Sequence, residues 1–230
     1  KRAFSGATSL EKIKLPKYLK TISYGTFMNC NSLEEIALPD TLTFIDSNTF
    51  NNCKKLKTIK IPKRITEISP YTFAECSSLE KVTLHDNISV ICDYAFTGTT
   101  SLKNITLPKS ITRIGIGAFS GALNLEKINL PEKLVYLGDS AFSGCEKIKN
   151  ITIPGNVDSL REEVFSSCTS LETVKVNSGV ISIDKRAFAG CTSLKNVVLP
   201  LPDEPIITST LPFSRVRSMP LSTWVLPKFL

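Results

Sequence analysis

The stretch AFAGCTSLKNVVLP, residues 187–200, decides the fold of this chain because it recurs along most of the sequence at a fixed interval of 23 residues. Each copy contains a phenylalanine in the same phase, and no insertion interrupts the series. Self-similarity at such an interval is the sequence signature of a repeat architecture. The nine phenylalanines are Phe4, Phe27, Phe50, Phe73, Phe96, Phe119, Phe142, Phe165 and Phe188.

Each repeat also contains a segment typical of a short β-strand. Aliphatic residues follow the phenylalanine by six, nine and eleven positions, as Leu194, Val197 and Leu199 do in the last copy. A proline usually comes next and ends the strand, because it cannot donate to a sheet ladder; His85 and Asn177 take its place twice. A second apolar pair follows later in the repeat. No single unit can bury its apolar side alone, so the pattern predicts stacked coils.

The frame A-F-x-x-C-x-S-L-x-x-I-x-L-P-x-x-L-x-x-I resembles the BspA-type leucine-rich repeat, which is found in surface proteins of bacteria and of some mucosal protozoa. The resemblance covers residues 1–200. It implies a leucine-rich-repeat solenoid of about nine 23-residue coils, with one short parallel strand per repeat, in a β-rich or α/β-type horseshoe or arc. Because the family includes adhesins that bind host matrix proteins, the resemblance also implies an interaction role at a surface.

Most cysteines occupy one repeat position, three residues after the phenylalanine. Alanine or threonine fills the same position in the other repeats, so the requirement is for a small and tolerably apolar side chain. We therefore expect free buried thiols rather than catalytic or metal-binding ones. Disulfides between neighbouring rungs remain possible by distance, although parallel side chains are poorly aimed for them. The column reads Ala7, Cys30, Cys53, Cys76, Thr99, Ala122, Cys145, Cys168 and Cys191.

The remaining cysteine, Cys92, lies in a heterogeneous column that we expect to be exposed, and it is the candidate for the more reactive thiol. The chain has no C-x-x-C pair and no cluster of cysteine with histidine, so nothing indicates a zinc site.

Charges alternate in sign at the position seven residues after the phenylalanine. Stacking would place opposite charges side by side, worth about 0.2–1 kcal/mol per exposed pair. A slip by one rung would bring like charges together, so the pattern can protect the register. The alternative is a solvated face with accidental order. From the second repeat onward the column reads Glu34, Lys57, Glu80, Lys103, Glu126, Lys149, Glu172 and Lys195.

The outward strand positions, eight and ten residues after the phenylalanine, should line the concave surface of the solenoid. They are polar and mildly basic, with Glu35 as the only acid and with no aromatic residue or arginine. Because strong interfaces usually rely on such anchors, a partner here would be acidic or glycan-like and bound weakly at each copy. Inert solvated surface is the alternative. The candidate residues are Lys12, Lys14, Lys60, Lys81, Thr83, Thr106, Lys127, Asn129, Asn150, Thr152 and Lys175.

Other chemistry is not indicated. The 230 residues, 42% hydrophobic, can bury a core but include no apolar run of about 18 residues, so we expect no membrane insertion. The net charge is +7, yet the basic residues form no block, which argues against nucleic acid. With His85 as the only histidine, no catalytic triad can be assembled. Residues 114–119, IGIGAF, lack the third glycine of a phosphate loop. We predict no enzyme, no metal and no cofactor.

After Pro200 the phase decays. Residues 201–230 are rich in proline and contain the only tryptophan, Trp224. We expect this segment to cap the last rung, or else to form a stiff linker. The chain begins partway through a repeat, so we also expect it to be a monomeric domain of a larger protein.

These observations favour a non-enzymatic protein- or glycan-binding module, a cell-surface or secreted adhesion domain whose signal and anchor lie outside this chain. Host or matrix proteins or glycans, acidic ones included, would be the partners. The alternative is a structural spacer or an intracellular interaction scaffold, which free thiols favour because oxidising compartments tend to pair cysteines.

Overall fold

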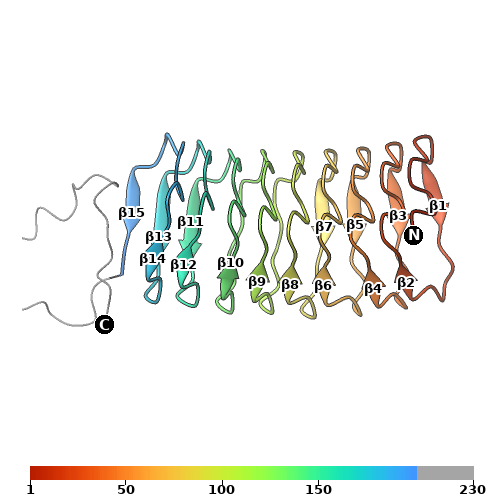
Figure 1. Cartoon of the computed structure of the whole chain (residues 1–230), viewed down its shortest axis with the longest axis horizontal. Coiled ribbons are helices and arrows are strands. Elements are labelled where there is room, and N and C mark those ends of the chain that lie inside the picture. Colours follow the sequence, from red (N-terminus) through yellow and green to blue (C-terminus); the bar gives the residue numbers. More distant parts are fainter. Residues whose placement is uncertain (201–230) are drawn as a thin grey trace, which may run out of the picture.

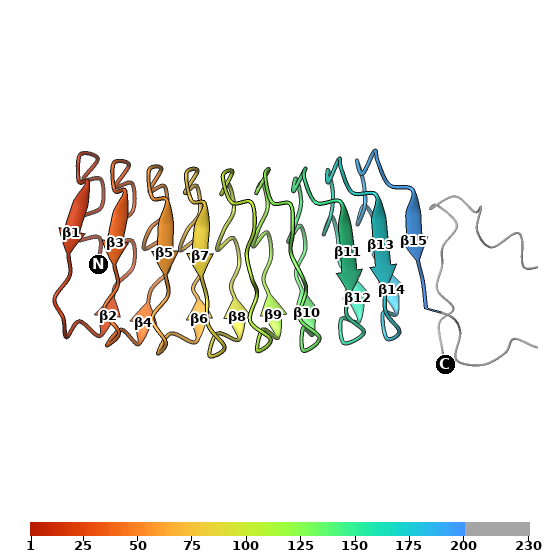
Figure 2. The same ribbon diagram turned by 180° about the vertical axis from the view of Figure 1, so that it is seen from behind.

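The computed structural model describes residues 1–200, which form one elongated solenoid of stacked coils (Figures 1 and 2). Phe4 lies on the first rung and Phe188 on the last one described, eight turns of 23 residues later. Among these residues the chain forms only short strands and turns, without a helix. The predicted leucine-rich-repeat solenoid is confirmed, whereas the segment predicted as a cap or linker, residues 201–230, lies outside the described residues.

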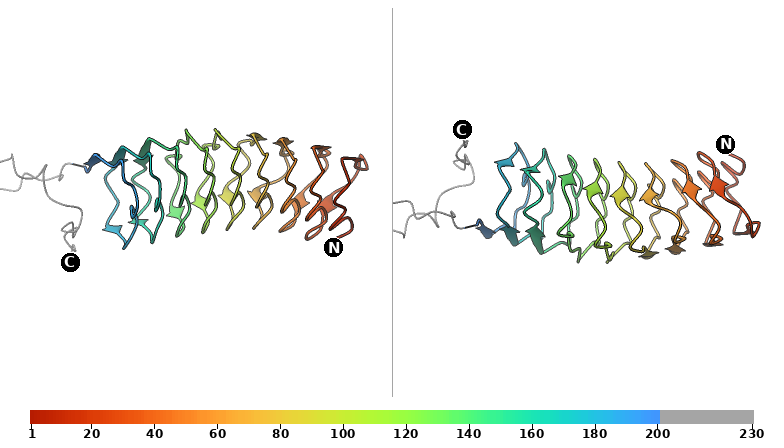
Figure 3. Two further views of the ribbon diagram at one scale, coloured as in Figure 1. Left: turned by 90° about the horizontal axis from the view of Figure 1, so that it is seen from above. Right: turned by 90° about the horizontal axis from the view of Figure 1, so that it is seen from below.

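Most coils contribute two strands, where the sequence predicted one. A first series begins eight residues after the phenylalanine and a second series seventeen residues after it, on different sides of the rod (Figure 3). We call these sides the first face and the second face. The first series comprises β1 (Lys12–Lys14), β3 (Glu35–Ala37), β5 (Thr58–Lys60), β7 (Lys81–Thr83), β11 (Asn150–Ile153), β13 (Thr173–Val176) and β15 (Asn196–Val198). The second comprises β2 (Thr21–Ile22), β4 (Phe44–Ile45), β6 (Glu67–Ile68), β8 (Val90–Ile91), β9 (Arg113–Ile114), β10 (Tyr136–Leu137), β12 (Ser159–Leu160) and β14 (Ser182–Ile183).

All strand pairs are parallel and keep the repeat in phase. Each strand residue pairs in register with the residue 23 positions later, as Ile13 pairs with Ile36 and Ile91 with Ile114. The second series forms a continuous sheet in the order β6-β8-β9-β10, with the pairs β2-β4 and β12-β14 beside it. Equivalent positions of successive repeats therefore form columns along the rod.

The first series has no strand between β7 and β11, and its pairing also breaks between β3 and β5. Its pairs are β1-β3, β5-β7 and β11-β13-β15. In between, residues 104–106 and 127–129 take the place of strands and are joined by a single bridge, between Asn104 and Lys127. In these rungs the second series continues, because β8 pairs with β9 and β9 pairs with β10. The coils therefore stay stacked although the strands of the first series are missing.

A ladder of stacked phenylalanines forms the centre of the core. Consecutive ring centroids lie 5.2 to 5.7 Å apart, and the ring planes differ by at most 12°. The rings from Phe27 to Phe165 are at most 1% exposed, whereas Phe4 is 41% exposed. Such a pair is worth about 0.5–1.5 kcal/mol beyond the burial of its apolar area. The ladder thus couples each rung to both of its neighbours.

The cysteine column bonds adjacent rungs. The six thiols of this column donate to the carbonyl of the phenylalanine 26 residues earlier, with S···O distances of 3.0 to 3.2 Å. Where Ala122 replaces cysteine, the carbonyl of Phe96 accepts a hydrogen bond from the Thr99 hydroxyl instead, at 2.8 Å. All seven cysteines are free. The expectation of free buried thiols is therefore confirmed for the column, although Cys191, on the last rung, is only partly buried.

Cys92 lies outside the column and is half-buried. Burial, together with the nearby carboxylates of Glu67 and Asp93, raises the pKa of its thiol to about 11. Because the thiolate is the reactive species, this environment opposes the reactivity expected from the sequence. Cys191 is also partly exposed, and the neighbouring Cys168 thiol, which can donate to its thiolate, lowers its pKa.

Replacing Phe96 by alanine should lower the free energy of unfolding by about 3–5 kcal/mol, because the ring is fully buried and stacked on both sides. Phe4→Ala should cost clearly less, since that ring is 41% exposed. Tyr18→Ala, at a side chain that is 77% exposed, is the control and should change stability by less than about 0.5 kcal/mol. Guanidinium denaturation followed by circular dichroism measures all three. Equal losses at Phe4 and Phe96 would contradict the ladder's role.

The buried thiols should make the fold sensitive to alkali. Burial raises the pKa of Cys76 to about 12, so above the ordinary thiol pKa the unfolded chain loses this proton while the folded chain keeps it. The contribution of this thiol to the free energy of unfolding is fully present below about pH 8.5 and is lost as the pH rises toward 12. Between pH 8 and pH 10 the loss should be about 2 kcal/mol.

Cys76→Ala should therefore reduce the loss of stability between pH 8 and pH 10 by about that amount, as measured by denaturation at the two pH values. Ser5→Ala, a change at a partly buried serine of the first repeat, is a control that should leave the pH dependence unchanged, because the serine hydroxyl does not titrate in this range. An identical pH dependence in Cys76→Ala and the parent chain would show that the buried thiol is not responsible.

Candidate binding surface

The structure places every candidate residue predicted from the sequence on the first face. All of them are exposed, because successive strand residues alternate between the core and solvent. Lys60 is the register partner of Thr83, and Thr152 is the partner of Lys175, so in each of these two pairs a lysine lies beside a threonine on the adjacent rung. The result is a polar strip along the rod with a regular spacing.

The charges of this strip are mostly unpaired. Lys12 is the exception, because its Nζ lies 2.9 Å from Glu35 Oε1. This hydrogen bond raises the pKa of Lys12 and lowers the pKa of Glu35. The other candidate lysines form no ion pair with any described residue, and their ammonium groups are available to a ligand.

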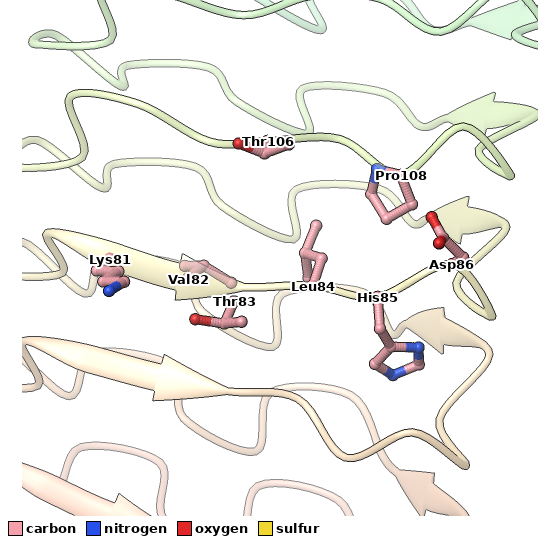
Figure 4. A pocket seen from close by; sticks show the side chains of 8 residues that line it. All are labelled: Lys81, Val82, Thr83, Leu84, His85, Asp86, Thr106 and Pro108. Atoms are coloured by element: carbon pink, nitrogen blue, oxygen red, sulfur yellow. The ribbon is translucent and has the colours of Figure 1, made fainter.

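A shallow depression of about 350 Å³ opens on the first face beside β7 (Figure 4). It lies where the first series is interrupted, between β7 and the next rung, which contributes Thr106 and Pro108. Lys81 and Thr83, both candidate residues, contribute to its lining from β7. The lining residues are Lys81, Val82, Thr83, Leu84, His85, Asp86, Thr106 and Pro108.

His85, at the rim of this depression, has a structural role. Its Nδ1 accepts a hydrogen bond from the backbone N–H of Asn87, so the ring proton sits on Nε2 and is donated to the carbonyl of Pro62 at 2.8 Å. The ring points toward the preceding rung, whereas the Asp86 carboxylate points away from it (Figure 4). The two side chains form no acid–base pair, in agreement with the sequence-based interpretation of His85 as a substitute for proline.

The alternating charge column is present, but most of its neighbouring charges do not form ion pairs. Successive members lie on adjacent rungs, as the hydrogen bond from Glu80 N–H to the Lys57 carbonyl shows. Within residues 1–200, only Lys195 and Glu172 of this column come within ion-pair distance, at 3.2 Å. Exposed ion pairs contribute little to stability. The effect of the pattern is therefore mainly to keep like charges off adjacent rungs.

Among the described residues, no group of three or more histidine, cysteine, aspartate or glutamate side chains could hold a metal ion. No helix in residues 1–200 has the length and hydropathy needed to cross a membrane.

Sequence reasoning missed the second face. Arg113 in β9 and Tyr136 in β10 are register partners on this sheet, and Arg161 lies over the same tyrosine ring from the following rung. The first face has no comparable aromatic or arginine group. A column-by-column comparison of the residues seventeen, nineteen and twenty-one positions after each phenylalanine would have found them.

Comparison with known structures supports the fold. The chain is similar to a leucine-rich cell surface protein from Faecalibacterium prausnitzii, at 26% identity and a TM-score of 0.52, over 87% of this chain and 76% of that one. A leucine-rich repeat protein from Bacteroides ovatus is 30% identical with a TM-score of 0.70, over 86% of this chain and 57% of its own length. A leucine-rich repeat protein from T. pallidum is 25% identical with a TM-score of 0.63, over 80% and 81% of the two chains.

No protein of curated function matches the sequence. The family model of the BspA-type leucine-rich repeat region matches residues 1–121 and 89–210, which together include the whole solenoid. The match agrees with the 23-residue frame, the cysteine column and the parallel strands described above. This chain belongs to the BspA-type leucine-rich repeat family.

Proposed function

We propose that this protein is a non-enzymatic binding module of a cell-surface or secreted protein, and that its first face binds an acidic protein or glycan. The observation that supports this most directly is the strip of exposed, largely unpaired lysines interleaved with threonine and asparagine along successive rungs. Membership of a repeat family rather than an enzyme family, and similarity to a cell surface protein, agree with it.

The expected binding is weak at each contact and strengthened by repetition. Lysine side chains act as exposed point charges and, without an aromatic or arginine anchor, each contributes little. The strip repeats the same groups along the rod, so a long acidic partner can contact several rungs at once. Such binding should weaken as the salt concentration rises, because exposed charges are screened.

A structural spacer or an intracellular scaffold is the second candidate function. The free cysteines favour it, because exported proteins usually pair theirs. Yet five of the six thiols in the column are buried and bonded to carbonyls of the preceding rung. Burial protects such thiols from oxidants, so their free state says little about the compartment.

The binding test uses the full chain displayed in many copies on beads and applied to an array of matrix proteins and glycans. The triple variant Lys60→Gln, Lys81→Gln, Lys127→Gln removes three charges from the first face. We expect it to reduce retention on acidic array members about tenfold or more, since each lost contact is multiplied across the copies.

The matched control Lys63→Gln, Lys109→Gln, Lys133→Gln removes the same charge from exposed positions outside the candidate set and should retain binding. Equal losses in the two triple variants would mean that net charge, not the first face, causes retention. No retention of the parent chain on any array member would favour the spacer.

A further inference from the structure

The second face presents a group of aromatic and arginine side chains that the proposed function does not use. Two of its members belong to β9 and β10, strands in the middle of the rod (Figure 1). The group contains three of the five tyrosines of the chain. We call it the tyrosine–arginine cluster, and its members are Tyr71, Tyr94, Arg113, Tyr136 and Arg161.

Tyr136 lies beside two guanidinium groups from neighbouring rungs. The Cζ atom of Arg113 is 3.9 Å from the centroid of the Tyr136 ring, and the Cζ atom of Arg161 is 4.7 Å from it. Arg113 comes from the rung before Tyr136 and Arg161 from the rung after it. A guanidinium stacked on an aromatic ring keeps its N–H groups directed outward in its own plane, where they can bind a planar acceptor.

The two arginines differ in their charge partners. Arg113 Nη2 lies 3.8 Å from Asp93 Oδ1. Arg161 is half-buried, yet it forms no ion pair and donates no side-chain hydrogen bond within residues 1–200. The two carboxylates that follow it in the sequence contact Arg186 of the next rung instead. All five N–H donors of the Arg161 guanidinium are thus available, in a fork that fits a carboxylate.

The other two tyrosines form a stack of their own on the preceding rungs. The ring centroids of Tyr71 and Tyr94 lie 4.9 Å apart, with planes inclined by 16°. The Tyr94 ring covers Gly117, where an added Cβ would lie 2.5 Å from the ring. Both tyrosines have φ of 56°, at a turn position where φ is positive in every described repeat, with residues as different as Gly25, Asn48 and Glu163. The coil imposes this conformation, and the side chain there is free to vary, as the 38% exposure of Tyr71 shows.

The composition of the cluster favours a protein partner over a polyanion. Protein interfaces are enriched in tyrosine and arginine and depleted of lysine, and the cluster follows that pattern. Asp93 offsets part of its positive charge, whereas sites for polyanions accumulate cations. Val135 precedes Tyr136 in the sequence and is 57% exposed, so an exposed apolar side chain adjoins the tyrosine along the chain.

We propose that the tyrosine–arginine cluster is a docking site for an acidic peptide segment of a partner protein. A carboxylate of the segment is held by two hydrogen bonds from Arg161, and an apolar side chain packs against Tyr136 and Val135. The site lies on the second face, does not use the first-face lysines and does not depend on the function proposed above.

The test begins with selection of a random dodecapeptide library, displayed on phage, against the immobilised full chain. Selected sequences are synthesised with a fluorophore, and their affinities are measured by fluorescence polarisation. We expect enrichment of aspartate and glutamate next to apolar residues. Arg161→Gln should weaken binding about tenfold or more, and Arg161→Lys nearly as much, because lysine keeps the charge but loses the two-pronged geometry.

Arg64→Gln, at an exposed arginine outside the cluster, is the matched control and should leave the affinity within about twofold. Tyr136→Phe should retain binding and Tyr136→Ala should lose it, since the stacked ring rather than its hydroxyl positions the guanidinium. Unchanged circular dichroism and melting temperature in Arg161→Gln and Arg161→Lys would show that any loss is not one of folding.

Three results would overturn the proposal. The first is a selection that yields no binding peptide or no enrichment of acidic residues. The second is an affinity of Arg161→Gln within twofold of the parent chain. The third is tighter, Arg161-dependent binding of heparin or single-stranded DNA, which would identify a polyanion as the occupant.

Discussion

Every part of this molecule depends on the burial of one apolar side of each coil against the next coil. The Phe96 ring illustrates the constraint, because it is fully buried only through Phe73 on one side and Phe119 on the other. A coil that lost phase by one residue would carry its phenylalanine, its leucine and its small cysteine-position residue out of their columns together. The 23-residue interval is therefore fixed by packing, and the thiol–carbonyl bonds between rungs can form only where that phase holds.

The same constraint leaves the exposed columns free to vary. Strands pair through their backbones, so an outward side chain needs only to tolerate an extended conformation. The column that contains Arg113 and Tyr136 also holds Thr21 and Glu67 at equivalent positions. The type of exposed side chain can consequently change from rung to rung without altering the backbone of the coil. Lysine, threonine and asparagine accumulate on the first face, whereas tyrosine and arginine gather over a few rungs of the second.

The sequence predicts the columns well because burial repeats at each turn and single positions can be compared nine times over. It predicts strand pairing less well. The second series has only two residues per strand, and the interruption after β7 affects residues 104–106, whose apolar pattern matches that of paired rungs. The position of Arg161 over Tyr136 joins two different columns of adjacent rungs, so a comparison within one column cannot reveal it. Free thiols follow from the column, but the pKa of Cys92 depends on Glu67 and Asp93 beside it.

The two faces also differ in the range over which they act. Exposed lysine charges act over about 8 Å at physiological salt, so in the binding proposed for the first face they would affect the rate of encounter more than the lifetime of a complex. A stacked arginine acts only at contact and through a fixed geometry, so it affects mainly the rate of dissociation. Because the buried columns hold each rung in place, a change of an outward side chain on one face should leave the other face undisturbed. A solenoid of this kind can therefore present two binding chemistries on one backbone without a compromise between them.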